Sequence, residues 1–360
     1  MAGGSGRPWA SDEAWLLVEQ ASDAGAARRA ATDLGERLGL DAHRCAELAL
    51  VATELATNLV KHARQGTLLV RSLRAADGAG VGLVAVDSGP GVADLAAAAV
   101  DGTSSTGTLG LGLGAILRLS TACAVHGVRG RGTVVAVEVW AQPRPAGAAA
   151  PAGGGWVDGL TRPMTGEEVC GDAVAVRHLA DGELLLGVDG LGHGPQAARA
   201  AAEAVRAFHD TADEDPVAVL AQLHAALRGT RGAAVAVALV QRSHQRVRFA
   251  GLGNVSGWVV APAGSDGDHR LGGRRRSMLS QPGIVGHHSR SLRETLHELP
   301  DDAAVVLHSD GVRPQWSLDD TPGVLRRGPL VLAATLLRDA GVRRDDASVL
   351  VDAPSGGEAA

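Results

Sequence analysis

Residues 188–194, VDGLGHG, close an apolar run with one carboxylate, Asp189, and then place three glycines within five residues. Glycine suits such a stretch because it adopts backbone conformations that other residues avoid. Three interpretations fit the glycines equally well: a loop that binds phosphate, a turn that holds a metal ion, or a simple reversal of the chain. Acidic residues elsewhere in the sequence decide between them.

Three further acidic motifs stand, like Asp189, at the margin of a predicted strand. They are CGDAVAV with Asp172, AAVVLHSDGV with Asp310, and RRDDASVLV with Asp345 and Asp346. A single aspartate at a strand end is ordinary turn chemistry. Together the motifs predict a converging cluster, and because clustered carboxylates repel one another, the cluster implies cations. Oxygen ligands alone favour Mg²⁺ or Mn²⁺ over zinc.

The stretch around Asp189 is therefore interpreted as a metal-binding turn. A helix predicted from Pro195 (PQAARAAAEAVRAF) keeps the phosphate-binding loop as the second interpretation, because a helix N-terminus attracts anions. Chain reversal alone is the third.

Length and composition bound the architecture and the partners. A chain of 360 residues exceeds what one core usually supports, so two domains are expected. The net charge of −6 is mild and predicts no attraction to nucleic acid or to anionic lipid. With no apolar run of membrane-spanning length, no signal-peptide core and only three scattered cysteines, the sequence predicts a soluble cytoplasmic protein.

The clearest division of the chain is AQPRPAGAAAPAGGGW, residues 141–156, which is rich in Pro, Ala and Gly and carries one charge. Such a composition is typical of a flexible linker. Strand-like sequence ends just before it and resumes after it. We therefore expect domains at residues 10–140 and 157–353.

In the N-terminal half, CAELALVATELATNLVKHA (45–63) predicts a helix, because Leu48, Val51, Leu55 and Leu59 recur on one face. Beside that face lies a polar stripe made of Glu54, Asn58, Lys61 and His62, which taken alone favours a solvated surface. Two glycine-bearing segments follow the helix. VGLVAVDSGPGV (81–92) predicts a strand that ends in Asp87, followed by Gly89 and Gly91; STGTLGLGLGAILRLS (105–120) places Gly107, Gly110, Gly112 and Gly114 before a second helical pattern.

Taken in order, these three segments resemble the ATP-binding domain of the GHKL superfamily, and more narrowly the RsbT-like switch kinases and anti-sigma-factor serine kinases. The resemblance covers about residues 12–140. It implies that Asn58 coordinates Mg²⁺ on the phosphates of ATP, that Asp87 accepts a hydrogen bond from the adenine amino group, and that Glu54 assists deprotonation of the attacking hydroxyl. It also implies that five glycines shape the nucleotide pocket: Gly89, Gly91, Gly110, Gly112 and Gly114.

The C-terminal half resembles the metal-dependent PPM serine/threonine phosphatases in their SpoIIE/RsbX branch, over about residues 157–353. GEEVCGDAVAV, DGLGHG, GLGNVSGW, GIVG, LHSDGV and DDASVLV stand in the order of that branch. The resemblance implies two Mn²⁺ or Mg²⁺ ions, with Asp346 able to exchange roles with Asp345. The ligands that it implies are Asp172, Asp189, the Gly190 carbonyl, Asp310 and Asp345. It also implies that His193 protonates the leaving serine oxygen, and stabilising the turn is the alternative role of this histidine.

Together the two resemblances imply an α+β protein, in which a GHKL (Bergerat-type) α/β sandwich of helices on a mixed sheet is followed by a β-sandwich flanked by helices. They imply a bifunctional kinase and phosphatase that acts on a STAS-domain anti-sigma antagonist, with a sigma factor or its regulator as a further partner. Two alternatives remain open for the first domain: an anti-sigma factor that sequesters its partner, or an ATP sensor without transferase activity.

Overall fold

The computed structural model describes residues 9–91, 112–142, 156–262, 275–287 and 291–354. These residues form two compact units, 9–142 and 156–354, each with its own sheets and buried core. Within the described ranges, no helix is long and apolar enough to cross a membrane. Of the predicted linker only residues 141, 142 and 156 are described, and Trp156 already begins a strand.

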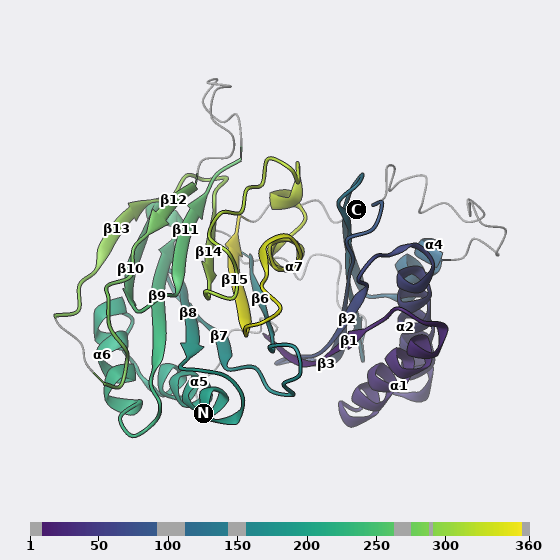
Figure 1. Ribbon diagram of the computed structural model, residues 1–360, viewed down its shortest axis with the longest axis horizontal. Coiled ribbons are helices and arrows are strands. Elements are labelled where there is room, and N and C mark those ends of the chain that lie inside the picture. The colour runs from purple at the N-terminus through teal and green to yellow at the C-terminus, as the bar shows by residue number, and fades with distance from the viewer. Residues whose placement is uncertain (1–8, 92–111, 143–155, 263–274, 288–290, 355–360) are drawn as a thin grey trace. The chain divides into compact units, whose positions relative to one another are not determined.

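In the first unit, helices pack on one five-stranded sheet (Figure 1). In spatial order the strands are β1 (Trp9–Leu17), β2 (Thr67–Ala75), β3 (Gly78–Val86), β5 (Gly132–Trp140) and β4 (Ala122–Val128). The helices are α1 (Ala21–Arg37), α2 (Ala42–His62) and α4 (Gly112–Leu119). The predicted mixed sheet is wrong, since every pairing among the described strands is antiparallel. Short turns join β2 to β3 and β4 to β5, and a hairpin reverses the strand direction.

Helix α2 positions the polar stripe that the sequence singled out. It begins after Asp41, whose side chain accepts a hydrogen bond from the Arg44 N–H at 2.8 Å and so caps the first turn. The predicted apolar face, from Leu48 to Leu59, is buried against the sheet. Burying that face fixes the rotation of the helix and leaves Glu54 and Asn58 half-buried, while His62 at the end of the helix is exposed.

The second unit is a sandwich of two five-stranded antiparallel sheets (Figure 1). The first sheet contains, in spatial order, β13 (Thr295–Glu298), β10 (Arg246–Leu252), β9 (Ala233–Gln241), β8 (Gly182–Gly190) and β7 (Asp172–Leu179). The second contains β12 (Arg275–Met278), β11 (Ser256–Val260), β14 (Ala304–His308), β15 (Ala347–Ala353) and β6 (Trp156–Arg162). Apolar side chains of both sheets form one core between them.

Helices cover the outer faces of this sandwich. Helix α5 (Pro195–Asp210) and helix α6 (Pro216–Ala226) pack on the first sheet, and α7 (Pro329–Ala340) packs on β15 and β6 of the second. Two single-turn helices, η1 (Arg242–His244) and η2 (Val324–Arg326), complete the unit. The predicted β-sandwich flanked by helices is confirmed, and so is the helix predicted from Pro195.

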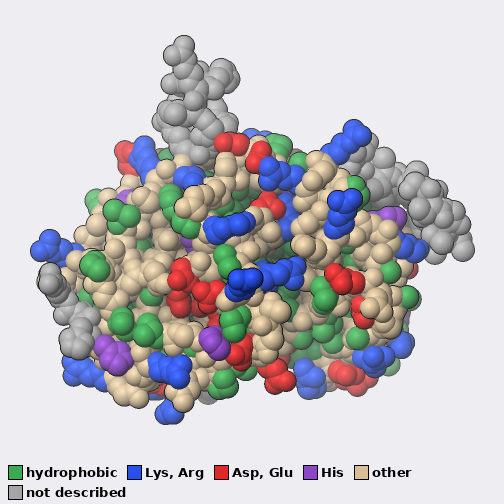
Figure 2. All heavy atoms as spheres, viewed as in Figure 1, with side chains coloured by type: hydrophobic (Ala, Val, Ile, Leu, Met, Phe, Trp, Pro, Cys, Tyr) green, Lys and Arg blue, Asp and Glu red, His purple; other side chains and the backbone are tan. Residues whose placement is uncertain are grey.

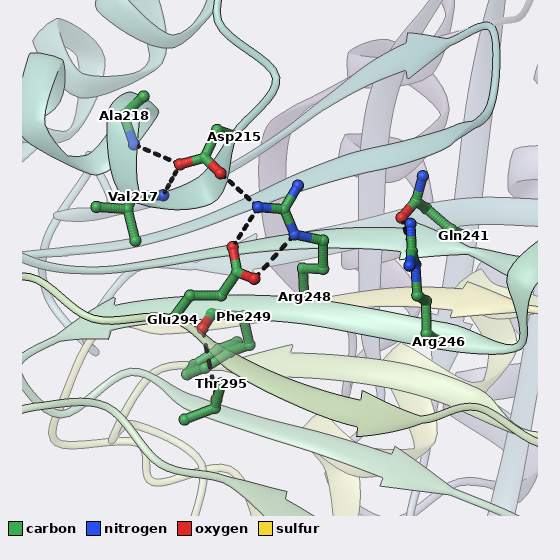
Figure 3. A network of polar contacts seen from close by, with 9 residues as sticks. All are labelled: Asp215, Val217, Ala218, Gln241, Arg246, Arg248, Phe249, Glu294 and Thr295. Atoms are coloured by element: carbon green, nitrogen blue, oxygen red, sulfur yellow. Dashed lines mark hydrogen bonds and ion pairs between the residues drawn. The ribbon is translucent and has the colours of Figure 1, made fainter.

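A polar network ties helix α6 to the first sheet (Figure 3). Arg248 on β10 donates to Glu294 through Nε at 2.9 Å and Nη2 at 2.7 Å, and it also bonds to Asp215. Asp215 in turn caps α6 by accepting from the backbone N–H groups of Val217 and Ala218, each at 3.0 Å. The contacts of Arg248 with Glu294 and Asp215 join elements of the same unit. We therefore interpret this cluster as structural.

Candidate functional site

The predicted carboxylates come from both sheets and meet at one end of the sandwich. Asp172 opens β7 and lies directly opposite Asp189 near the end of β8. Asp310 follows β14, and Asp345 precedes β15, which pairs with β14 in the other sheet. The charge of Asp189 interacts with those of Asp172, Asp310 and Asp345, and the Asp310 carboxyl lies within hydrogen-bonding reach of Asp189. The sequence set is thus one spatial cluster.

Burial and mutual repulsion both disfavour the charged forms of these carboxyls. Burial, followed by the charges of Asp172, Asp310 and Asp345, raises the pKa of Asp189 to about 8. Burial is also the first cause that raises the pKa of Asp172 to about 7. The Oδ2 atom of Asp172 is buried without a hydrogen-bond partner among the described residues. An oxygen so placed, among like charges, calls for a cation.

The two adjacent aspartates of the DDASVLV motif do different things. Asp346 is buried, and its Oδ1 and Oδ2 accept from the backbone N–H groups of Met164 at 2.8 Å and Gly171 at 2.9 Å. Asp345 is partly exposed; burial and the charge of Asp310 raise its pKa. Both oxygens of Asp346 are therefore used by the backbone, whereas Asp345 accepts from one backbone N–H group, that of Asp346, and its charge interacts with that of Asp310.

Gly190 sits where only glycine fits. A Cβ added there would lie 2.5 Å from the Ala197 carbonyl oxygen and 2.7 Å from that of Gly171, closer than real Cβ contacts allow. The Gly190 N–H donates to the Gly171 carbonyl at 3.1 Å. This close packing holds the end of β8 against the start of α5 and against the residue before Asp172.

Two side chains flank the carboxylates and complete the site. Asn254 donates from Nδ2 to Oδ2 of Asp310 at 2.6 Å and so orients that exposed carboxyl. His193 is exposed, and its Nδ1 lies 2.7 Å from Oε1 of Glu167. His193 is also close enough to Asp345 to lower the pKa of that carboxyl slightly against the raising effects. The imidazole thus stands at the rim of the cluster, held by a carboxylate.

Figure 2 shows acidic side chains gathered on the visible face of the second unit. Among the described residues, no three acidic, His or Cys side chains converge tightly enough to form a ready-made metal cage. The donor set is nonetheless made of oxygens alone, the set that hard divalent cations take. The residues present therefore fit Mg²⁺ or Mn²⁺ by chemistry, by the unpartnered Asp172 oxygen and by their shared repulsion.

In the first unit, α2 and α4 bring together part of the predicted nucleotide set. A Cβ added to Gly112, the first residue of α4, would lie 3.5 Å from Oδ1 of Asn58 and 3.8 Å from Oε2 of Glu54. Asn58 and Glu54 are both half-buried on α2. The first residue of α4 thus lies beside the amide of Asn58 and the carboxylate of Glu54.

Asp87 follows β3 and is held by backbone N–H groups. Its Oδ1 accepts from Gly89 at 2.6 Å, and its Oδ2 accepts from Thr133 at 3.1 Å. A Cβ on Gly89 would lie 2.6 Å from the His62 carbonyl oxygen, so the end of α2 packs directly on this turn. Two backbone N–H groups therefore fix the Asp87 carboxylate in place.

The remaining predicted glycines are placed unevenly. Gly91 has φ +71°, and a Cβ there would lie 2.1 Å from the Val128 carbonyl oxygen. Gly114 is buried within α4. Gly110, like Gly107, lies outside the described residues. The described members thus surround the α2–α4 contact and the turn after β3.

Residues 17–139 match the family model of the histidine kinase-like ATPase domain, and residues 181–351 match that of stage II sporulation protein E, SpoIIE. The chain carries a histidine kinase-like ATPase domain followed by a SpoIIE domain. The ATPase domain is similar to the serine/threonine-protein kinase RsbT of Bacillus subtilis, with 28% identity over 130 residues, 36% of this chain and 98% of RsbT.

The chain is also similar to solved protein structures. A chain from a structure of the bacterial stressosome is 30% identical and has a TM-score of 0.46; the match covers 54% of this chain and 97% of that chain. The crystal structure of RsbX in complex with magnesium is 16% identical, with a TM-score of 0.43, and covers 55% and 96% of the respective chains.

Sequence reasoning missed four residues of the SpoIIE-domain site. Glu167 was not singled out, because nothing in its sequence surroundings marks it as the partner of His193. Ser309 and Ser348 both hydrogen-bond to Asp172, and His308 supports Ser309. The serines adjoin the SDG and DDAS motifs, so proximity to a predicted ligand was the signal available for them.

Proposed function

We propose that this chain both adds and removes phosphate on a serine or threonine of a STAS-domain regulator in a sigma-factor or stress pathway. The ATPase domain is the kinase and the SpoIIE domain is the phosphatase. The observation that carries the phosphatase half is the convergence of four aspartates from two sheets at one end of the sandwich. The likeness of the first domain to RsbT supports the kinase half.

The metal ligands in this proposal are Asp172, Asp189, the Gly190 carbonyl, Asp310 and Asp345. Asp345 is preferred to Asp346 because both oxygens of Asp346 accept from backbone N–H groups. Two Mn²⁺ or Mg²⁺ ions bound there supply compensation of phosphoryl charge and a water of lowered pKa. Asn254 keeps Asp310 turned toward the cluster.

His193 donates the proton that the departing serine or threonine oxygen needs. Its exposed ring lies at the rim of the carboxylates, where a phosphoserine side chain can approach. The Glu167 carboxylate, 2.7 Å from Nδ1, orients the ring and directs Nε2 outward as the donating atom. Serine is a poor leaving group, so the proton matters most for the natural substrate.

In the ATPase domain, Asn58 takes the Mg²⁺ of ATP and Glu54 accepts the proton of the attacking hydroxyl. Asp87 binds the adenine amino group, and the backbone N–H groups of Gly89 and Thr133 hold its carboxylate in place for that role. Gly89, Gly91, Gly110, Gly112 and Gly114 provide close backbone approach to the nucleotide.

The test uses the intact chain with ATP, Mg²⁺, Mn²⁺ and a STAS-domain protein recovered by pulldown from the native host. Wild type should consume ATP while little phosphorylated partner accumulates. Asp189→Asn should let phosphopartner build up, because transfer continues after reversal is lost. Asn58→Ala combined with Asp189→Asn should abolish that accumulation. Mass spectrometry of the partner maps the phosphorylated residue.

Two other outcomes would identify the alternative functions of the ATPase domain. If Asp189→Asn leaves the partner unphosphorylated under saturating ATP, opposed activities are excluded and the domain acts as an ATP sensor. If pulldown recovers a sigma factor in stable complex with the ATPase domain, the domain acts as an anti-sigma factor. Either result leaves the phosphatase assignment standing, because Mn²⁺-dependent hydrolysis tests that separately.

A further inference from the structure

His308, the last residue of β14, receives hydrogen bonds from two tryptophans at a single nitrogen. Trp258 on β11 donates from Nε1 to His308 Nε2 at 3.0 Å, and Trp316 donates from Nε1 to the same atom at 3.2 Å. The other ring nitrogen, Nδ1, lies 2.8 Å from the Ser309 carbonyl oxygen. His308 and Trp316 are almost fully buried.

These three contacts allow only one form of the ring. An indole N–H donates and never accepts, so Nε2 must be the unprotonated nitrogen. A carbonyl oxygen only accepts, so Nδ1 must carry the proton. The neutral Nδ1–H tautomer alone satisfies both indoles and the carbonyl of Ser309, and any other form leaves a buried donor facing a donor.

The ring is connected through Ser309 to two residues of the carboxylate cluster. The Ser309 N–H donates to the Ser348 carbonyl at 3.2 Å, and the Ser309 hydroxyl accepts from the Ser348 N–H at 2.9 Å. Both serine side chains hydrogen-bond to Asp172. Asp310 follows Ser309 directly. Because His308 holds the Ser309 carbonyl group, it also fixes the position of the Asp310 backbone.

Arg275 contacts the rings of both tryptophans. The carbon of its guanidinium lies 4.7 Å from the ring centroid of Trp258 and 4.3 Å from that of Trp316, both within cation–π range. Its Nη1 donates to the Pro314 carbonyl at 3.1 Å. The two tryptophans meet edge to face at 5.8 Å, so they form a rigid pair that Arg275 spans.

We propose that Trp258 and Trp316, clamped by Arg275, lock His308 as the Nδ1–H tautomer and thereby position Asp172 and Asp310 for divalent cations. His308 is a positioning residue in this arrangement, because it acts through Ser309 and touches no substrate. The inference rests on the proposed metal site. Outer residues that orient ligands typically change metal affinity by about 10- to 100-fold when they are replaced.

The first measurement compares two replacements of equal size, His308→Asn and His308→Leu. Asn places an amide N–H where Nδ1 was and can still donate to Ser309, whereas Leu cannot. Mn²⁺ titrations followed by electron paramagnetic resonance should show affinity within about threefold of wild type for Asn, and on the order of 10-fold weaker for Leu. Equal affinity for Leu and wild type would overturn the proposal.

The second measurement reads the tautomer without metal. Long-range ¹⁵N–¹H spectra of wild type should show His308, assigned by its loss in His308→Leu, as pure Nδ1–H. The double variant Trp258→Phe with Trp316→Phe keeps both rings but removes both donors, so an Nε2–H signal should appear. Trp9→Phe, an exposed tryptophan in the other unit, is the matched control. A pure Nδ1–H signal in the double variant would show that the indoles do not hold the ring.

Failure of the metal site itself would look different. If wild type binds no Mn²⁺, or if Asp189→Asn binds it as tightly as wild type, the proposed ligand set is wrong and the positioning role falls with it. If wild type binds Mn²⁺ and only the His308 variants are neutral, the ligand set stands and the positioning role alone is refuted.

Discussion

Asp172 and Asp189 stand on directly opposed residues of the antiparallel strands β7 and β8. Like charges in facing positions of a sheet destabilise it. Asp172 is buried, and burial with neighbouring carboxylates raises its pKa to about 7 and that of Asp189 to about 8. The fold thus carries a local cost in the metal-free protein at the place where cations would offset it.

Asp189→Asn should therefore separate stability from activity. In EDTA the variant should unfold a few degrees higher than wild type, because removing one of the repelling carboxylates relieves the buried cluster. The same variant should lose Mn²⁺-dependent hydrolysis of p-nitrophenyl phosphate. Calorimetry and the hydrolysis assay check the two halves, with Asp302→Asn, an exposed turn residue, as control. A lower melting temperature together with wild-type turnover at saturating Mn²⁺ would contradict the assignment.

Asn58→Ala should abolish binding of Mg-ATP and leave p-nitrophenyl phosphate hydrolysis unchanged. The Asn58 amide faces the space beside Gly112, whereas the carboxylate cluster belongs to the other domain. Isothermal titration calorimetry measures the nucleotide affinity. Thr57→Ala, one position along the same helix, is the control and should bind normally. Unchanged affinity in Asn58→Ala would remove this residue from the nucleotide site.

The loss of kcat in His193→Ala should depend on the leaving group of the substrate. On a phosphoserine peptide kcat should fall by about 10²-fold or more, because the serine oxygen leaves with a proton from His193. On p-nitrophenyl phosphate the loss should be much smaller, because p-nitrophenolate departs without protonation. Glu167→Gln, which weakens the 2.7 Å contact to Nδ1, should reproduce the trend more mildly. Equal losses on both substrates would argue for a role in holding the turn.

Replacing Arg242 and replacing Arg248 should lower the free energy of unfolding by different amounts, because their acidic partners differ in burial. Arg242 is 13% exposed and pairs with Asp352, which is fully buried, while Arg248 is 28% exposed and pairs with partners that are 25% and 45% exposed. Arg242→Met should cost about 3 kcal/mol in the free energy of unfolding. Arg248→Met, in the network of Figure 3, should cost about 1 kcal/mol. Urea denaturation measures both, and equal costs would count against this account.

Elements with a periodic apolar pattern, or with a clear start signal such as proline after glycine, could be predicted from the sequence. Helix α2 was predicted from its apolar spacing, and the start of α5 from a proline after glycines. The carboxylate set was found because each member adjoins an apolar strand. The antiparallel order of the first sheet was missed, since strand direction depends on which strands pair and not on their composition.

Other parts of the site depend on contacts between distant segments. Asp345 and Asp346 are indistinguishable in sequence, and only the backbone N–H groups of residues 164 and 171 tell them apart. Glu167 meets His193 across 26 positions. The two indoles reach His308 from 50 and 8 positions away. No local pattern carries such information, because each partner is defined by the folded chain.

The bond from Gly171 to Asp346 has a kinetic consequence for amide protons. Asp346 holds the N–H groups at 164 and 171, which bracket the segment that carries Glu167, and it is covalently next to Asp345. A cation that restricts the motion of Asp345 would also restrict that of the adjacent Asp346, and with it the hydrogen bonds from the N–H groups of residues 164 and 171. The two amides should then exchange with deuterium at one common rate, which slows as Mn²⁺ is added and is unchanged by ATP. Isotope uptake at these two positions would therefore report occupancy of the proposed metal site in the intact chain without any turnover.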